Sequence, residues 1–310
     1  MSGSHASAVD ARGGLGAGEL RATLLVLFSA CCFGSITIFV TIATSTGARL
    51  VDVLAWRYLL GALLLRMLSG GFGAGKVAPR RALSLLSLAG GGQAVVAILS
   101  LSALEYVSVS TVTFLFYSYP AWVALISAMR GTEPLTGRRV VALVLSLTGI
   151  VVMVGMPGAG GLNPIGVTLA LVSAFLYALY IPMMGRFGES FSPAVVASYA
   201  SAGAAIIFTI AAVVRGGPVF ALAPVAWGMI GLLAVLSTAI AFLAFLRGLA
   251  IIGPVRTSIV STIEPFWATL LASVALGQAL SPRTLGGGVL IAEAVVILNL
   301  RPAASRPAGA

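Results

Sequence analysis

The sequence has very few charged side chains, and this scarcity excludes a water-soluble fold. Of its 310 residues, only 8% are charged and 59% are hydrophobic, and the mean hydropathy is +1.10. In a soluble domain about a quarter of the residues are charged, so this chain cannot cover a surface that faces water. The sequence therefore predicts an integral membrane protein.

The residues that most enzymes and metal sites require are also scarce. His5 is the only histidine, and the only cysteines, Cys31 and Cys32, are adjacent, which gives no disulfide framework or zinc site. No acidic pair at helical spacing occurs within an apolar stretch, as acid–base or metal chemistry would need. The glycine triplets at 90–92 and 286–288 neither follow a strand nor precede a lysine, so a phosphate-binding loop is not expected. We expect neither an enzyme nor a resident cofactor or metal.

What the sequence does contain is ten long apolar stretches. A helix needs about 20 mostly apolar residues to cross the hydrocarbon core of a bilayer. Lipid cannot satisfy free backbone groups, so each span must be helical, and the short alternating segments of a membrane β-barrel are not seen. The predicted fold is all-α with ten transmembrane helices, which begin near Ala22, Leu50, Leu83, Val109, Val140, Ile165, Pro193, Val225, Val255 and Leu285.

The net charge of +10 is explained by membrane orientation and not by a nucleic-acid partner. Basic residues collect in the cytoplasmic loops of membrane proteins. With ten spans and the N-terminus inside, only Arg49, Arg215 and Arg283 lie in outer loops, and Arg57 lies within a span. The cytoplasmic side then holds Arg12, Arg21, Arg66, Lys76, Arg80, Arg81, Arg130, Arg138, Arg139, Arg186, Arg247, Arg256, Arg301 and Arg306. This distribution predicts that both termini are cytoplasmic.

An internal repeat divides the chain into two halves. Residues 103–152 align with residues 248–297 at a constant offset of 145, without a gap. The informative coincidence is a Pro-x-Trp motif in two aligned spans, which pairs Pro120 with Pro265 and Trp122 with Trp267. We expect five-helix repeats at 22–155 and 164–300, a disordered cytoplasmic tail at 1–21 and a second cytoplasmic tail at 301–310.

Earlier segments of the two halves align less regularly. Ser29 meets Ser173 at an offset of 144, and the offset of 145 sets Gln93 opposite Thr238. Because each half has an odd number of helices, the second half enters the membrane from the opposite side. Inverted repeats are a common architecture of secondary transporters, with the solute site near the midplane between the halves.

Several of these segments resemble a known family. The second predicted helix contains "RYLLGALLL" (Arg57 to Leu65), and the fourth helix of each half has a proline and is followed by a short turn. Together with the segments Leu101–Gly155 and Phe245–Leu280, they are similar to the EamA family of the drug/metabolite transporter superfamily. Glu133 matches the acidic residue that members often have after the fourth helix of each half, but its counterpart here is Gln278.

The resemblance implies a bacterial inner-membrane exporter or permease for amino acids or related metabolites. Two alternatives share the fold: a flippase-like carrier of lipid-linked sugar, and a multidrug or cation exporter. The expected partners are a small-molecule solute, membrane lipid and a proton as candidate coupling ion. The sequence does not specify the oligomeric state.

Ionisable residues within the spans are the first candidates for a site, since each costs roughly 2.5–3.5 kcal/mol to insert. Glu264 precedes Pro265, which lacks an amide and loosens the helix, so its carboxylate is suited to bind a substrate ammonium or carry a proton. Arg57 could bind a substrate carboxylate, or instead neutralise Asp52 or Glu264. Glu293 is expected to be a buried strut or an oligomer contact.

Polar and aromatic residues complete the predicted substrate site. Tyr117 in the fourth span and Tyr177 in the sixth have the character of pocket walls with oriented hydroxyls, and interhelical hydrogen bonding or an interfacial belt is the alternative. Gln93 and Thr238 are added because the repeat pairs them. Pro120 and Pro265 are predicted to gate the fourth and ninth helices.

Overall fold

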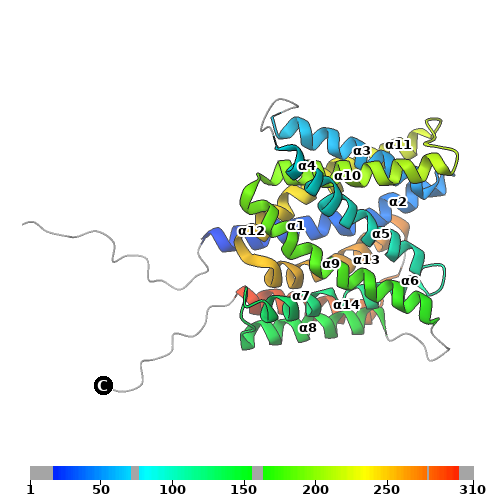
Figure 1. Ribbon diagram of the computed structural model, residues 1–310. Helices are drawn as coiled ribbons and strands as arrows, with labels where there is room; N and C mark the ends of the chain where they lie inside the picture. Colours follow the sequence, from blue (N-terminus) through cyan, green and yellow to red (C-terminus); the bar gives the residue numbers. More distant parts are fainter. Residues whose placement is uncertain (1–16, 71–76, 156–162, 278, 300–310) are drawn as a thin grey trace, which may run out of the picture.

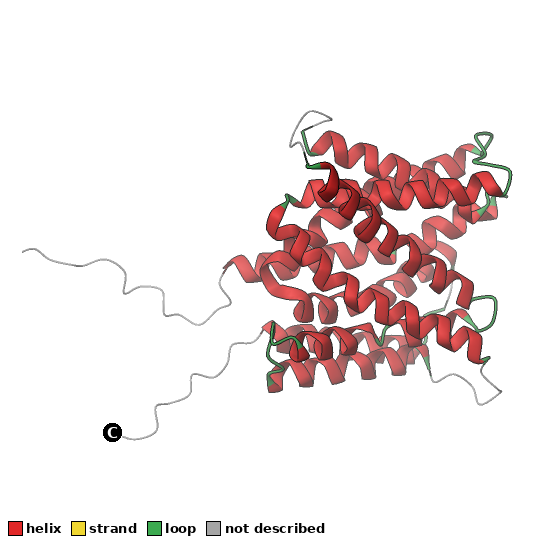
Figure 2. Ribbon diagram, in the orientation of Figure 1, coloured by secondary structure: helices red, strands yellow, loops and turns green. Residues whose placement is uncertain are grey.

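The computed structural model describes residues 17–70, 77–155, 163–277 and 279–299, and every regular element in these ranges is helical (Figure 2). The helices before residue 156 are α1 (Ala17–Gly34), α2 (Ile36–Ser45), α3 (Leu50–Leu68), α4 (Pro79–Ser84), the π-helical η1 (Leu85–Gly91), α5 (Gly92–Ala103), α6 (Val109–Phe116), α7 (Tyr119–Met129) and α8 (Gly137–Val154). Those after it are α9 (Pro164–Ser190), α10 (Pro193–Val214), α11 (Pro224–Leu232), the π-helical η2 (Leu233–Ile240), α12 (Ala241–Val260), the 3-10 helix η3 (Ser261–Ile263), α13 (Glu264–Leu276) and α14 (Pro282–Asn299).

Local sequence signals explain where several helices begin. Ser108, Thr136 and Ser192 each precede a helix and accept a hydrogen bond from a backbone amide three residues later. Proline is the first residue of α9, α10, α11 and α14, where its missing amide costs no helical hydrogen bond. The predicted starts at Leu50, Val109 and Pro193 coincide with the first residues of α3, α6 and α10.

The first helix begins earlier than predicted. The sequence prediction of a disordered tail was wrong for residues 17–21, which belong to α1. The Glu19 carboxylate pairs with Arg256 at 3.1 Å, and this tertiary contact holds the turn in place. Within the helix, the Glu19 carbonyl also accepts a hydrogen bond from the Thr23 hydroxyl. Residues 1–16 and 300–310, which make up the rest of the predicted tails, lie outside the described residues.

Eight helical segments in the described ranges are long and apolar enough to cross a membrane: 17–45, 79–103, 111–129, 137–154, 164–190, 193–214, 224–276 and 282–299. The helix α3 is not among them because Asp52, Arg57 and Arg66 lie within its 19 residues. The segment 224–276 is 53 residues long and bends at Gly253, whose φ of 77° is not helical. The expectation of a multi-pass, all-helical membrane protein is confirmed.

The helices form a layered bundle in which α3 and α10 lie at one edge and α8 and α14 at the other (Figure 1). The Tyr58 ring of α3 stacks on Phe208 of α10 at 5.5 Å, and Arg49, just before α3, donates to the carbonyl of Arg215, just after α10. The pair α3 and α10 is therefore antiparallel. The helices α8 and α14 are also antiparallel, because Gly149 packs on Ile291 while Met153, later in α8, packs on the earlier Gly287.

Two hydrogen bonds repeat the same geometry in the two halves. The Ser29 hydroxyl donates to the Ala241 carbonyl at 2.8 Å, and the Ser173 hydroxyl donates to the Val96 carbonyl at 3.0 Å. The two donors are 144 residues apart and the two acceptors 145. The packing of α1 on α12 thus has its counterpart in the packing of α9 on α5.

Close packing of α10 on η1 depends on glycine. At Gly203 a Cβ atom would overlap the backbone carbonyl oxygen of Leu86, which cannot move aside. We expect Gly203→Val to destabilise the protein by about 1–3 kcal/mol, as overpacked cores are. A thermal unfolding assay in detergent checks this against Gly231→Val, since no atom lies within 4 Å of the corresponding Cβ position at Gly231. Equal melting temperatures for the two variants would contradict the prediction.

Candidate functional site

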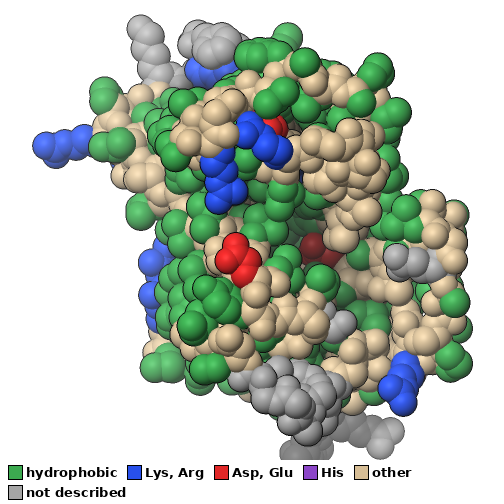
Figure 3. Space-filling model, turned by 90° about the vertical axis from the view of Figure 1, so that its right-hand side faces the viewer, with side chains coloured by type: hydrophobic (Ala, Val, Ile, Leu, Met, Phe, Trp, Pro, Cys, Tyr) green, Lys and Arg blue, Asp and Glu red, His purple; other side chains and the backbone are tan. Residues whose placement is uncertain are grey.

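A polar cavity opens between α6 and α13. It has a volume of about 480 Å³ and contains a single acidic side chain, Glu264. Its walls come from six helices, α1, α2, α6, α8, α13 and α14, and include Thr37, Thr41, Thr113, Tyr117, Thr269 and Thr284. The face of the molecule at this end is hollowed, and an acidic side chain lies recessed in the hollow (Figure 3). The cavity is therefore a recess in which one carboxylate and several hydroxyl groups are gathered.

Two breaks in the helices create this cavity. The chain turns at Tyr117 and Ser118 between α6 and α7, and it passes through η3 before α13. Pro120 and Pro265 are the second residues of the helices that follow. At this position a proline does not loosen a continuous helix, as the sequence suggested, but starts a new one without losing a hydrogen bond. Whether these breaks act as gates remains a prediction.

The two broken helices pack along each other on one side of their breaks and on different neighbours on the other side. The Tyr119 hydroxyl of α7 donates to the Ser258 carbonyl of α12 at 3.3 Å, and α7 packs along α12. Beyond the breaks, α6 packs on α5, α8 and α9, whereas α13 packs on α1, α2 and α14. The helices α6 and α13 thus diverge beyond the breaks, and Glu264 lies where they separate.

Glu264 lies against a cluster of aromatic rings. The Tyr117 hydroxyl is within hydrogen-bonding reach of the Glu264 carboxylate. Tyr119 and Tyr177 meet edge to face at 4.9 Å, and Phe116 lies 5.4 Å from Tyr177. The structure therefore brings Glu264, Tyr117 and Tyr177 together, and such a surface can hold a cation through both the carboxylate and the faces of the rings.

Gln93 joins this cluster from α5. Its side-chain oxygen accepts a hydrogen bond from Tyr180 at 3.0 Å, and its nitrogen donates to the Tyr58 hydroxyl at 3.2 Å. The Tyr180 ring in turn stacks on Tyr177 at 6.0 Å. The wide turns of η1 end immediately before α5, and such π-helical segments often occur at functional sites. Gln93 thus links the aromatic cluster to α3.

Arg57 and Thr238 form the other end of this polar network. The Arg57 Nε donates to the Thr238 hydroxyl at 3.0 Å, and its guanidinium lies 4.9 Å from the centre of the Tyr58 ring. Arg57 is only 4% exposed. Thr238 lies in η2 and bonds to Arg57, whereas its repeat partner Gln93 bonds to Tyr58 and Tyr180.

The structure also places the acidic residues near Arg57. Asp52 pairs with Arg49 at 2.6 Å, so Arg57 does not neutralise it. Among the described residues, no ion pair joins Arg57 to Glu264, although the charge of Arg57 acts on the Glu264 carboxylate.

The prediction of a buried strut at Glu293 was wrong, because its side chain is exposed on α14. The packing of α14 on α8 uses its glycine face instead.

Sequence reasoning missed two contacts in this region. Tyr58 bridges Gln93 and Arg57. Its position directly after Arg57 in α3 is the sequence feature that could have predicted this role. Glu133 accepts a hydrogen bond from the Val255 amide at 3.2 Å, across the two halves of the chain. No local sequence pattern predicts the contact between Glu133 and Val255, since these residues are 122 positions apart.

Comparison with known proteins agrees with this architecture. The model of the EamA-like transporter family matches residues 20–155 and again residues 164–300. The chain belongs to the EamA-like transporter family. This membership makes the protein a membrane transporter, and it confirms the resemblance seen in the sequence.

Two further similarities accompany the EamA-like match. An uncharacterized transporter of Clostridium kluyveri is 26% identical over 195 residues, which are 61% of this chain and 63% of that relative. The matched region thus spans less than two thirds of the relative's length. A crystal structure of a protein has the same fold, with a TM-score of 0.74 and 19% identity over 89% of this chain and 96% of that one.

Proposed function

We propose that this EamA-like protein exports an amino acid or a related zwitterionic metabolite by alternating access. The proposed protein has ten transmembrane helices in two inverted five-helix halves, residues 22–155 and 164–300. It lies in the bacterial inner membrane with both termini in the cytoplasm. The solute binds near the midplane, between Glu264 and Arg57.

The helix lengths support ten crossings. The segment 224–276 would extend roughly 80 Å as one straight helix, more than twice the thickness of the hydrocarbon core. Its bend at Gly253 divides it into two lengths that each suit one crossing. The 19 residues of α3 are long enough for another, and its three charged residues are near its ends or held in the interior.

The packing supports an inverted arrangement. The second helices of the two halves, α3 and α10, run antiparallel, and so do the last helices, α8 and α14. Contacts among Glu19, Arg256 and Asn299 place the beginning of α1 and the end of α14 at the same end of the bundle (Figure 1). Under the charge asymmetry of the loops this end is cytoplasmic, so the Glu264 cavity opens outward.

The observation that carries the proposal is a pair of opposite charges held apart in the interior. Glu264 faces the cavity beside Tyr117, and Arg57 is buried against Thr238 without a carboxylate partner in the described part of the chain. Leaving a charge inside a bilayer without a counter-charge is costly. A zwitterion satisfies both charges at once, its ammonium at Glu264 and its carboxylate at the planar fork of Arg57.

A cation exporter is the second candidate, and the aromatic cluster favours it. Aromatic rings beside a carboxylate are suited to an organic cation, which needs no guanidinium. The lipid-linked sugar carrier receives less support. A lateral apolar groove of about 380 Å³, lined by Leu59, Leu63 and Leu86, shares no lining residue with the Glu264 cavity.

Uptake into proteoliposomes tests the proposal. We expect saturable transport of at least one amino acid from a panel of amino acids, sugars and organic cations. The same panel measured with and without a pH gradient shows whether a proton is coupled. Transport of cations alone would replace the amino-acid proposal with the second candidate.

A further inference from the structure

The second part of α12 begins with backbone amides that need a cap. The helix bends at Gly253, where φ is 77° and ψ is 167°, and it restarts at Pro254. The first amides of a helix have no partners within it. At the equivalent position of the first half, 145 residues earlier, the Ser108 hydroxyl caps α6 by accepting from the Thr111 amide at 3.2 Å. Gly253 has no side chain with which to do this.

The missing cap comes from the other half of the protein. Glu133 lies in the connection between α7 and α8, and its Oε1 accepts from the Val255 amide at 3.2 Å. Its Oε2 lies 2.9 Å from Arg139, which orients the carboxylate. A Cβ atom at Gly253 would lie 2.8 Å from Oε1, so glycine is the residue that permits this approach. The cap of α6 is thus local, whereas that of α12 joins the two halves.

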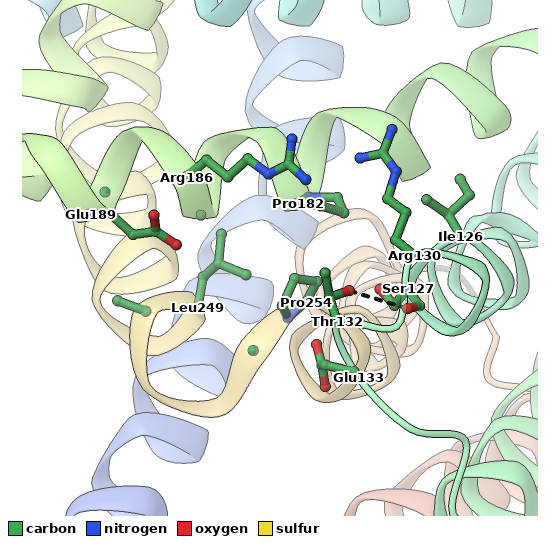
Figure 4. Close-up of a pocket in the computed structure, with 14 residues that line it drawn as sticks. Ile126, Ser127, Arg130, Thr132, Glu133, Pro182, Arg186, Glu189, Leu249 and Pro254 are labelled. Carbon is green, nitrogen blue, oxygen red and sulfur yellow. Dashed lines mark hydrogen bonds between the residues drawn. The ribbon is translucent and has the colours of Figure 1, made fainter.

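This contact lies at a second cavity, at the opposite end from Glu264. The second cavity has a volume of about 420 Å³ and is lined by Ser127, Glu133, Glu189 and Pro254, among others (Figure 4). Between the two cavities α7 packs on α12, and the Tyr119 hydroxyl donates to the Ser258 carbonyl, so these two helices separate one cavity from the other. The Glu133 contact therefore holds the two halves together at the end of the protein where the second cavity lies.

We propose that Glu133 is a latch that holds the two halves together at the second cavity and so keeps this cavity from opening further. This rests on the proposed function, in which the two cavities open in turn. A carboxylate at a helix N-terminus is stabilised by the amide and by the helix dipole, and it loses both when the helix moves away. Removal of the carboxylate shifts the population toward a state in which the second cavity is wider and the Glu264 cavity is narrower.

Thiol accessibility in the full-length protein tests the latch without any substrate. In a Cys31→Ala, Cys32→Ala background, a single reporter is placed at Ser127→Cys, which is buried at the second cavity, or at Thr113→Cys, which lines the first. With Glu133→Ala we expect labelling by a maleimide to become about tenfold faster at residue 127 and slower at residue 113. Glu133→Gln keeps an acceptor oxygen and should have a smaller effect.

Glu189→Ala is the matched control, because Glu189 lines the same cavity but its side chain is exposed. It should leave both labelling rates at their parent values. Unchanged rates in Glu133→Ala, or an increase at both reporters, would overturn the latch, since a cap with only a structural role loosens both sides. Failure of amino-acid transport would count against the proposed function and not against this result.

Discussion

Replacing Glu264 with glutamine is expected to lower amino-acid transport by at least about 100-fold. Glutamine keeps the size of the side chain and its contact with Tyr117, but it cannot neutralise an ammonium group inside the membrane. Removing one partner of a buried charge pair costs about 3–5 kcal/mol, which corresponds to a loss of this size or more. Initial rates in proteoliposomes, normalised to the amount of folded protein, measure the effect.

Glu293→Gln provides the control for this variant. Glu293 also lies within an apolar helix, but its side chain is exposed on α14 and does not line the cavity. Its replacement should leave transport unchanged. If Glu264→Gln also transports at the wild-type rate, and responds to a pH gradient as the wild type does, the carboxylate has no role in binding or coupling.

Replacing Arg57 with glutamine is expected to separate amino acids from amines. The guanidinium is buried, is bound by the Thr238 hydroxyl and has no carboxylate partner among the described residues. Without it the carboxylate of an amino acid is desolvated and unpaired, so we expect its KM to rise by roughly 10-fold to 100-fold. The corresponding amine, which has no carboxylate, should not lose affinity.

Arg57→Lys distinguishes charge from geometry in the same assay. Lysine keeps the positive charge but lacks the planar fork, so it should recover part of the affinity for the amino acid. A purely structural Arg57, which only ties α3 to η2, predicts a different result. In that case the variants would transport the amino acid and the amine more slowly to the same extent, and the thermal stability of the protein would also fall.

The sequence predicted the helical fold and singled out the two prolines beside which helices break, because both depend on local signals. Apolar runs specify the spans, and the Pro-x-Trp repeat placed Pro120 and Pro265 at equivalent breaks. Glu264 could be selected from the sequence because a charge beside a proline within an apolar run is rare. Glu264 lies at the cavity because the helix breaks immediately before it, at the start of α13.

What the sequence could not supply are contacts between distant segments. Gln93 and Thr238 are paired by the repeat, yet the structure gives them different partners, Tyr180 and Arg57. The repeat relates positions and does not bring them into contact. The Glu133 cap arises only where the first half meets the second.

Counterflow exchange by the wild-type protein tests the central claim most directly. Proteoliposomes loaded with one amino acid would be challenged with that amino acid, with its decarboxylated amine and with its deaminated acid. Two interior charges of opposite sign predict rapid exchange of the zwitterion and exchange at least about 100-fold weaker for each singly charged analogue. Exchange of the amine or the acid as fast as that of the amino acid would contradict binding between Glu264 and Arg57.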